Sequence, residues 1–191
     1  DGAEWNPVGS GLLSSSIDSY PAVFSMLVTD QGLYVGGWFR VAGDSYAEGF
    51  ALWDGAKWHV PAAETIGWNN FTVVYAMAEY QGEIYVAGEL MSPSYFDGAR
   101  SLAVWDGTEW LSDRDVQGRV DALAVHDHSL YVGGRFTQVN PGNPVAARNI
   151  ARWDGSQWYP VGRDGEGLDG PVSVLASAGD SLYVGGLFTA A

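Results

Sequence analysis

The acidic segment from residue 164 to residue 170 carries the kind of side chain that hard cations bind. It is written Asp-Gly-Glu-Gly-Leu-Asp-Gly, so Asp164, Glu166 and Asp169 share one glycine-rich segment. Carboxylate oxygens are the usual protein ligands of Ca²⁺, but this spacing is not that of an EF-hand loop. We therefore expect a solvated acidic loop and no cofactor, with Ca²⁺ bound by these three carboxylates as the alternative.

Other catalytic or metal-binding chemistry has little support. His126 and His128 flank Asp127 and present two imidazoles in one short polar segment, without a further metal ligand in evidence. The chain has no cysteine, which excludes thiolate metal sites and a cysteine nucleophile. It also has no Ser/His/Asp order, phosphate-binding glycine loop or metalloprotease motif. We therefore assign no catalytic residue.

Aromatic and amide side chains occur in segments that we expect to be long loops. Aromatic rings there could stack on sugars or anchor a protein partner. The alternative is that they pack within their own loops or fill the interior. The candidate ligand-binding residues are Tyr20, Tyr46, Trp68, Asn69, Tyr95 and Phe96.

One motif, typified by Leu-Tyr-Val-Gly-Gly, occurs four times and organises the rest of the chain. Its copies begin at residues 33, 84, 130 and 182, so the repeat unit has about fifty residues. The units span approximately residues 1–53, 54–105, 106–153 and 154–191. We expect one domain, residues 1–191, or a segment of a larger one.

Each unit contains short apolar segments bounded by turn residues, which is typical of strands. The first strands are expected at residues 23–28, 73–78, 120–125 and 172–176, and each second strand carries the repeated motif. Third strands end at Trp53, Trp105 and Trp153; an Asp-Gly turn follows, and fourth strands begin near Trp58, Trp110 and Trp158. No segment has helical periodicity with caps, so we predict an all-β fold.

Four-stranded antiparallel units with this period favour a β-propeller, in which each unit is one blade. A tandem array of separate sandwiches is the alternative, although about fifty residues is small for an independent core. The glycine pair of the repeated motif then allows a bulge, or a close approach of backbones, where strands crowd together.

The order of these motifs resembles kelch repeats and the related propeller of the galactose-oxidase type. Residues 130–162, which begin LYVGGRFTQV and end ARNIARWDGSQWYPVG, are more similar to tandem repeats of secreted and cell-surface bacterial proteins. The resemblance covers the whole chain and implies a propeller in an extracellular setting. It implies no single activity, because propellers host many functions. The copper chemistry of galactose oxidase does not carry over, since its cysteine-linked tyrosine has no counterpart here.

Antiparallel strand order assigns the connections to two faces. One face receives the tight turns at residues 29–32, 79–83, 126–129 and 178–181, together with the Asp-Gly turns. The opposite face receives the long loops at residues 9–21, 40–49, 61–71, 89–101, 112–119, 137–149 and 162–171. Binding residues concentrate on variable loops held by a rigid scaffold, so we place any site on this long-loop face.

The last unit has only its first two predicted strands. We expect residues 3–9 to return as its outermost strand, which leaves its third strand missing and its backbone groups unpaired. The sequence is then a segment of a longer repeat protein. The alternative is head-to-tail self-association, in which another chain donates the missing strand.

The net charge of −14 makes nucleic acid and anionic membrane surfaces poor partners. No apolar stretch reaches the length of a membrane span. We therefore expect a non-catalytic, extracellular or cell-surface repeat module for adhesion, ligand binding or surface assembly, with a protein or glycan bound at the long-loop face. The alternative is a carbohydrate-active enzyme, a glycoside hydrolase or lyase, with its carboxylates on that same face.

Overall fold

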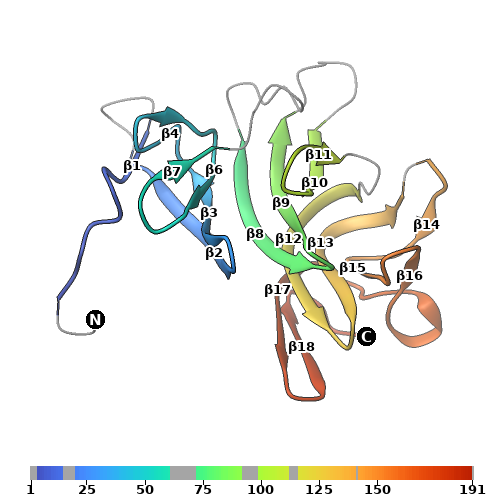
Figure 1. Ribbon diagram of the computed structural model, residues 1–191. Helices are drawn as coiled ribbons and strands as arrows, with labels where there is room; N and C mark the ends of the chain where they lie inside the picture. The colour runs from blue at the N-terminus through green and yellow to red at the C-terminus, as the bar shows by residue number, and fades with distance from the viewer. Residues whose placement is uncertain are drawn as a thin grey trace.

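The computed structural model describes residues 4–14, 20–60, 72–91, 99–111, 116–140 and 142–190. These residues form antiparallel β-sheets, and their helical structure is limited to one short 3₁₀ turn, η2 (Arg163–Gly165). In Figure 1 the sheets follow one another in chain order, from the blue strands of the first to the red hairpin of the last. The all-β prediction is confirmed.

Three of the sheets have the four predicted strands, each connected to its neighbour in the chain. The first contains β2 (Ala22–Thr29), β3 (Gly32–Trp38), β6 (Phe50–Trp53) and β7 (Trp58–His59). The second contains β8 (Val73–Tyr80), β9 (Glu83–Met91), β10 (Ala99–Trp105) and β11 (Trp110–Leu111). The third contains β12 (Val116–His126), β13 (Ser129–Val139), β15 (Ile150–Trp153) and β16 (Trp158–Pro160), with β14 (Val145–Ala146) beside β13. A fourth sheet is the hairpin of β17 (Val172–Ala178) and β18 (Ser181–Gly186).

The structure departs from the sequence prediction in several places. β14 and the first residues of β12 lie in segments predicted as loops. A fifth sheet forms from β1 (Leu12–Leu13), β4 (Val41–Ala42) and β5 (Ser45–Tyr46), all in segments predicted as loops, and none of the five sheets is closed. The prediction that residues 3–9 return as a strand of the last unit is wrong for the described residues 4–9, which are not in a strand. Instead the carbonyl oxygen of Val8 accepts a hydrogen bond from the indole of Trp58, 3.3 Å away in the first sheet.

Consecutive sheets pack against one another through their first strands. β2 and β3 contact β8, β8 and β9 contact β12, and β12 and β13 contact β17. Each contact buries an apolar cluster drawn from two sheets: Tyr34 and Phe50 meet Val74 and Met77 between the first and second. The predicted tight turns between β2 and β3, β8 and β9, β12 and β13, and β17 and β18 lie toward the same end of the stack in Figure 1.

The glycine pairs have the structural role that the sequence predicted. In each of the four sheets that contain the repeated motif, a β-bulge interrupts the first strand opposite the glycine pair or its Ala87-Gly88 counterpart, as between Val120 and Ala122 facing Gly134 and Gly133. At the second glycine, a Cβ atom would overlap a backbone carbonyl oxygen of the first strand: Gly37 faces Ala22, Gly88 faces Val73, Gly134 faces Arg119 and Gly186 faces Pro171. This position therefore has no room for a side chain.

The three Asp-Gly turns share one hydrogen-bonding pattern. The Oδ1 atom of Asp154 accepts hydrogen bonds from the backbone N–H groups of Ser156 and Gln157 at 2.7 and 2.8 Å. Asp54 and Asp106 accept equivalent pairs of hydrogen bonds from the backbone N–H groups two and three residues further along the chain. The glycine after each aspartate has a φ of 98–99°, which glycine adopts without strain. In each turn between the third and fourth strands, the aspartate therefore supplies an acceptor for two backbone N–H groups of the turn.

These hydrogen bonds hold the aspartate pKa values below their usual range. The largest cause is the backbone N–H of Glu109 for Asp106 and that of Gln157 for Asp154. For Asp54 it is the ring of His59, whose Nε2 lies 2.5 Å from Oδ2. A carboxyl group with a lowered folded-state pKa stabilises the fold above its unfolded-state pKa of about 4, and this stabilisation is lost as the pH falls through the folded value.

Replacing Gly134 with alanine is expected to lower the free energy of unfolding by about 1–3 kcal/mol, because the new Cβ overlaps the carbonyl oxygen of Arg119. Urea denaturation followed by tryptophan fluorescence measures the change. Gly142→Ala is the control, since nothing lies within 4 Å of a Cβ atom at that position. Equal stabilities for the two variants would contradict the close approach of the strands.

The double variant Asp106→Asn/Asp154→Asn is expected to have a lower Tm than the unmodified protein at pH 7. The difference should shrink as the pH falls below about 4, because the aspartates of the unmodified protein then lose their charge. Thermal unfolding by circular dichroism across pH 2–7 checks this, with Asp30→Asn/Asp180→Asn in exposed hairpin turns as the control. A constant difference in Tm across this range would exclude the linkage.

Candidate functional site

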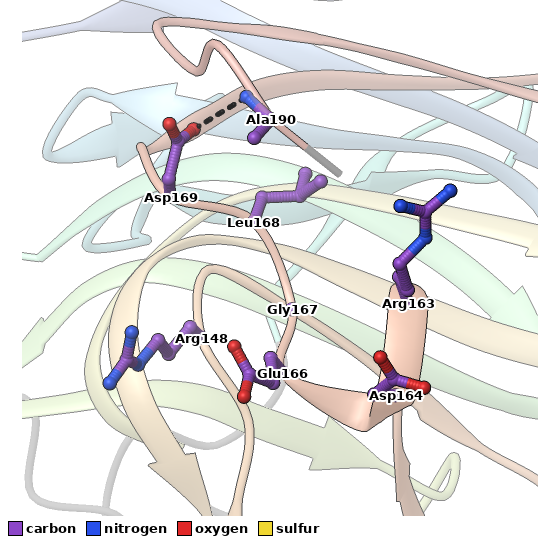
Figure 2. A pocket seen from close by; sticks show the side chains of 8 residues that line it. All are labelled: Arg148, Arg163, Asp164, Glu166, Gly167, Leu168, Asp169 and Ala190. Atoms are coloured by element: carbon purple, nitrogen blue, oxygen red, sulfur yellow. Dashed lines mark hydrogen bonds between the residues drawn. The ribbon is translucent and has the colours of Figure 1, made fainter.

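A pocket of about 310 Å³ lies where two predicted long loops meet. One loop, residues 137–149, contributes Arg148, and the other, residues 162–171, contributes the charged side chains of η2 and its flank. Figure 2 shows the lining side chains around the backbone of Gly167. The residues that line it include Arg148, Arg163, Asp164, Glu166, Leu168 and Asp169.

The two loops are joined by backbone contacts. The N–H of Leu168 donates to the carbonyl oxygen of Arg148 at 3.0 Å, and the Asn149 amide donates to the carbonyl oxygen of Leu168 at 2.9 Å. Gly167 has a φ of 81°, and a Cβ atom there would overlap the backbone of Arg148. The buried side chain of Leu168 packs into the core between the third and fourth sheets. The pocket floor is therefore held by the scaffold.

The three predicted calcium ligands are near one another, but they do not have the same surroundings. All three line the pocket, but only the carboxylate of Asp169 is hydrogen-bonded to Ala190, another lining residue (Figure 2). Its Oδ1 accepts hydrogen bonds from the N–H groups of Thr189 and Ala190 at 2.7 and 3.0 Å, and its Oδ2 accepts one from the Thr189 hydroxyl at 2.5 Å. These hydrogen bonds lower the pKa of Asp169, and the bond from the Thr189 hydroxyl has the largest effect. Its carboxylate is thus engaged in fixing residues 189–190.

No group of three or more histidine, aspartate or glutamate side chains is arranged to hold a metal ion in the described part of the chain. Arg148 and Arg163 line the same pocket as Asp164 and Glu166. Their positive charge disfavours a cation beside them. The calcium site stays a prediction from the sequence.

The predicted aromatic ligand-binding residues are only partly placed. Tyr20 is exposed just before β2, and Tyr46 is exposed on β5, where its hydroxyl accepts a hydrogen bond from the Arg40 guanidinium. Trp68, Asn69, Tyr95 and Phe96 lie outside the described residues. The described parts of the predicted long loops therefore include the pocket between Arg148 and η2 and the fifth sheet.

The histidine pair lies in the β12–β13 turn, among the tight turns. His126 Nδ1 is 3.0 Å from the Ser177 hydroxyl of β17, and His128 is fully exposed. A separate pocket of about 280 Å³ is lined by His126, Asp127, Gly179 and Asp180. The pair therefore lies where two hairpin turns meet, as the location of the tight turns predicted.

A charged and aromatic cluster at the bulges was not anticipated from the sequence. Arg119 Nε donates to Asp121 Oδ1 at 2.5 Å, its Nη1 lies 3.3 Å from Glu89 Oε1, and its guanidinium is 4.5 Å from the ring centroid of Tyr75. Hydrogen bonding to Asp121 raises the Arg119 pKa. The neighbouring Phe24 ring lies 5.9 Å from that of Tyr75.

Phe24, Tyr75, Asp121 and Ser173 all occupy the extra residue of a bulge, so they form one row across the first strands of the four sheets. The sequence does mark this position. The residue that follows the valine opposite the second glycine is of a different type in every repeat. Its variation between polar and aromatic types on an otherwise uniform strand marks a position free of the core.

Comparison of the chain with models of known protein families and with curated proteins gives no match. Among the described residues, no helix is long and apolar enough to span a membrane. The function must therefore be argued from the pocket, the loops and the charge distribution of this chain.

Arg119 and Tyr75 are expected to stabilise each other across the second and third sheets by about 0.5–1 kcal/mol. A double-mutant cycle of Arg119→Ala and Tyr75→Leu, measured by urea denaturation, gives this coupling. Additive effects of the two substitutions would mean that the observed stacking contributes nothing to stability.

Proposed function

We propose that this chain is a non-catalytic, extracellular binding module that holds a glycan at the long-loop face of a β-propeller. The observation that carries the proposal is the pocket built by two variable loops on a repeated scaffold. Loops of this kind are where rigid scaffolds place binding residues. An acidic surface and the resemblance to repeats of secreted bacterial proteins support the extracellular setting.

The packing of the sheets supports the propeller. Each sheet lays the face of its first hairpin on the next sheet, and the first strands β2, β8, β12 and β17 follow in this order. Radial blades pack in this way, because every inner sheet needs apolar side chains on both faces. The second sheet meets this requirement, with Met77 and Val86 buried toward the first sheet and Ala78 and Tyr85 buried toward the third.

The pocket lining favours a hydroxyl-rich ligand over an apolar one. Arg148 and Arg163 offer N–H donors, whereas Asp164 and Glu166 offer acceptors. Alternating donors and acceptors suit the hydroxyl groups of a sugar, and a guanidinium pairs well with a sugar carboxylate. The lining holds two arginines beside the carboxylates of Asp164, Glu166 and Asp169, so we propose that the guanidinium groups themselves, and not an overall positive charge, bind the carboxylate of an acidic oligosaccharide.

Arg148→Ala/Arg163→Ala is expected to weaken binding of a uronic-acid oligosaccharide about tenfold or more, because hydrogen bonds to a charged partner are lost. Isothermal titration calorimetry measures the affinity, with a neutral oligosaccharide of equal length as the comparison ligand. Arg152→Ala is the matched control, since Arg152 stacks 4.5 Å from the Tyr159 ring on the third sheet and does not line the pocket.

Two outcomes would reject the proposal. Equal affinities of the pocket variant and the Arg152→Ala control would remove this pocket as the glycan site. Cleavage of the oligosaccharide during the titration, detected as new reducing ends, would support the carbohydrate-active enzyme instead.

A further inference from the structure

A further pocket, of about 400 Å³, adjoins the pocket between Arg148 and η2. We call it the Arg135 pocket, and the one between Arg148 and η2 the η2 pocket. The two linings meet at consecutive residues, because Arg148 lines the η2 pocket and Asn149 lines the Arg135 pocket. The residues that line the Arg135 pocket are Gln117 of β12, Arg135, Phe136 and Thr137 of β13, and Asn149 and Pro171.

A fixed piece of backbone separates the two pockets. The Asn149 amide donates to the carbonyl oxygen of Leu168 at 2.9 Å, and the N–H of Leu168 donates to the carbonyl oxygen of Arg148 at 3.0 Å. Leu168 is itself anchored in the core between the third and fourth sheets. Successive Cα atoms are about 3.8 Å apart, so a ligand that passes from one pocket to the other crosses a single chain segment. A short oligosaccharide is therefore long enough to occupy both pockets.

The two pockets differ in charge. The η2 pocket places its two arginines beside carboxylates, whereas Arg135 is the one charged residue among the described residues that line the Arg135 pocket. In the described part of the chain, the Arg135 guanidinium has no ion pair, hydrogen bond or ring contact. Arg119, which lies opposite it in the strand register, has Asp121 at 2.5 Å and Glu89 at 3.3 Å. The Arg135 pocket therefore offers a positive charge that the described residues do not neutralise.

The rest of the lining suits a sugar ring. Phe136 and the half-buried Pro171 give the pocket apolar surface, while the exposed residues Gln117 and Thr137 add an amide and a hydroxyl group. A pyranose ring has the matching combination, with C–H groups on its faces and hydroxyl groups around its edge. Small-molecule sites commonly join apolar lining to a few placed polar groups in this way. Together with Arg135, the lining matches a sugar that carries a carboxylate.

Arginine occurs at both of these places in the third repeat alone. The residue that follows the second glycine of the pair is Trp38, Glu89, Arg135 or Leu187 in the four repeats. The residue five positions before the tryptophan that ends the third strand is Glu48, Arg100 or Arg148 in the three repeats that contain this strand. The scaffold therefore accepts other side chains at both places, and the pair of arginines is a feature of this one junction between sheets.

We infer that the Arg135 pocket is a second subsite for the ligand of the η2 pocket, and that this ligand is a polyuronate. One carboxylate of the oligosaccharide pairs with Arg148 and Arg163, and a carboxylate on another sugar unit pairs with Arg135 through a bidentate contact. The inference rests on the proposed function, because it extends the acidic oligosaccharide placed there. One molecule that fills both subsites binds more tightly than a ligand with one acidic unit, since the second contact forms within the complex.

Isothermal titration calorimetry with galacturonic acid and with tetragalacturonate tests the second subsite. The unmodified protein is expected to bind the tetrasaccharide about tenfold or more tightly than the monosaccharide. Arg135→Ala should remove most of this gain and leave the affinity for galacturonic acid unchanged, because Arg135 lies outside the η2 pocket. Arg135→Lys should retain part of the gain, since lysine keeps the charge but not the planar fork. Arg152→Ala is the control, because Arg152 lines neither pocket.

The pattern of losses separates this inference from the proposed function. Loss of tetragalacturonate binding in Arg148→Ala/Arg163→Ala but not in Arg135→Ala would overturn the second subsite and leave the proposed function standing. Loss in Arg135→Ala alone, or no binding of tetragalacturonate to the unmodified protein, would overturn both. An equal loss for the monosaccharide and the tetrasaccharide in Arg135→Ala would overturn the subsite, as would undiminished binding of fully methyl-esterified tetragalacturonate, which has no carboxylate.

Discussion

Neighbouring sheets lie close together because the second strand of each repeat carries small residues where side chains would hold the sheets apart. The first glycine of the pair faces the next sheet: a valine methyl group covers Gly36 and another covers Gly133. The second glycine faces its own first strand, where a carbonyl oxygen occupies the place of a Cβ atom. Ala87 replaces only the first glycine, so a methyl group is accepted between sheets but not within one.

The aspartate carboxylates whose hydrogen bonds are described mainly stabilise turns and loops. Asp54, Asp106 and Asp154 hold the turns before the fourth strands, and Asp169 holds residues 189–190. Three of the arginines lie instead at contacts between parts of the molecule. Arg119 joins two sheets, and Arg148 and Arg163 come from different loops to line the pocket. A high carboxylate count therefore does not by itself locate a binding site in this protein.

The scaffold separates the packed faces of the sheets from the loops at the ends of the strands. Ligand binding is proposed at the ends of the strands, where loops vary in length and sequence without disturbing the packing of sheets.

The sequence by itself determined the strands and their order, because the motif repeats with alternating apolar residues, glycine pairs and Asp-Gly turns, all local signals. Most of the candidate site needed the tertiary structure. Arg148 and Arg163 line one pocket because Leu168 packs between the third and fourth sheets, and Arg119 reaches Tyr75 because two bulges align. The two-residue strands β1, β4 and β5 are too short to leave a periodic pattern. Which copies of the repeat are covered is likewise decided by packing, since Met26 and Met77 have the same type and register but opposite exposure.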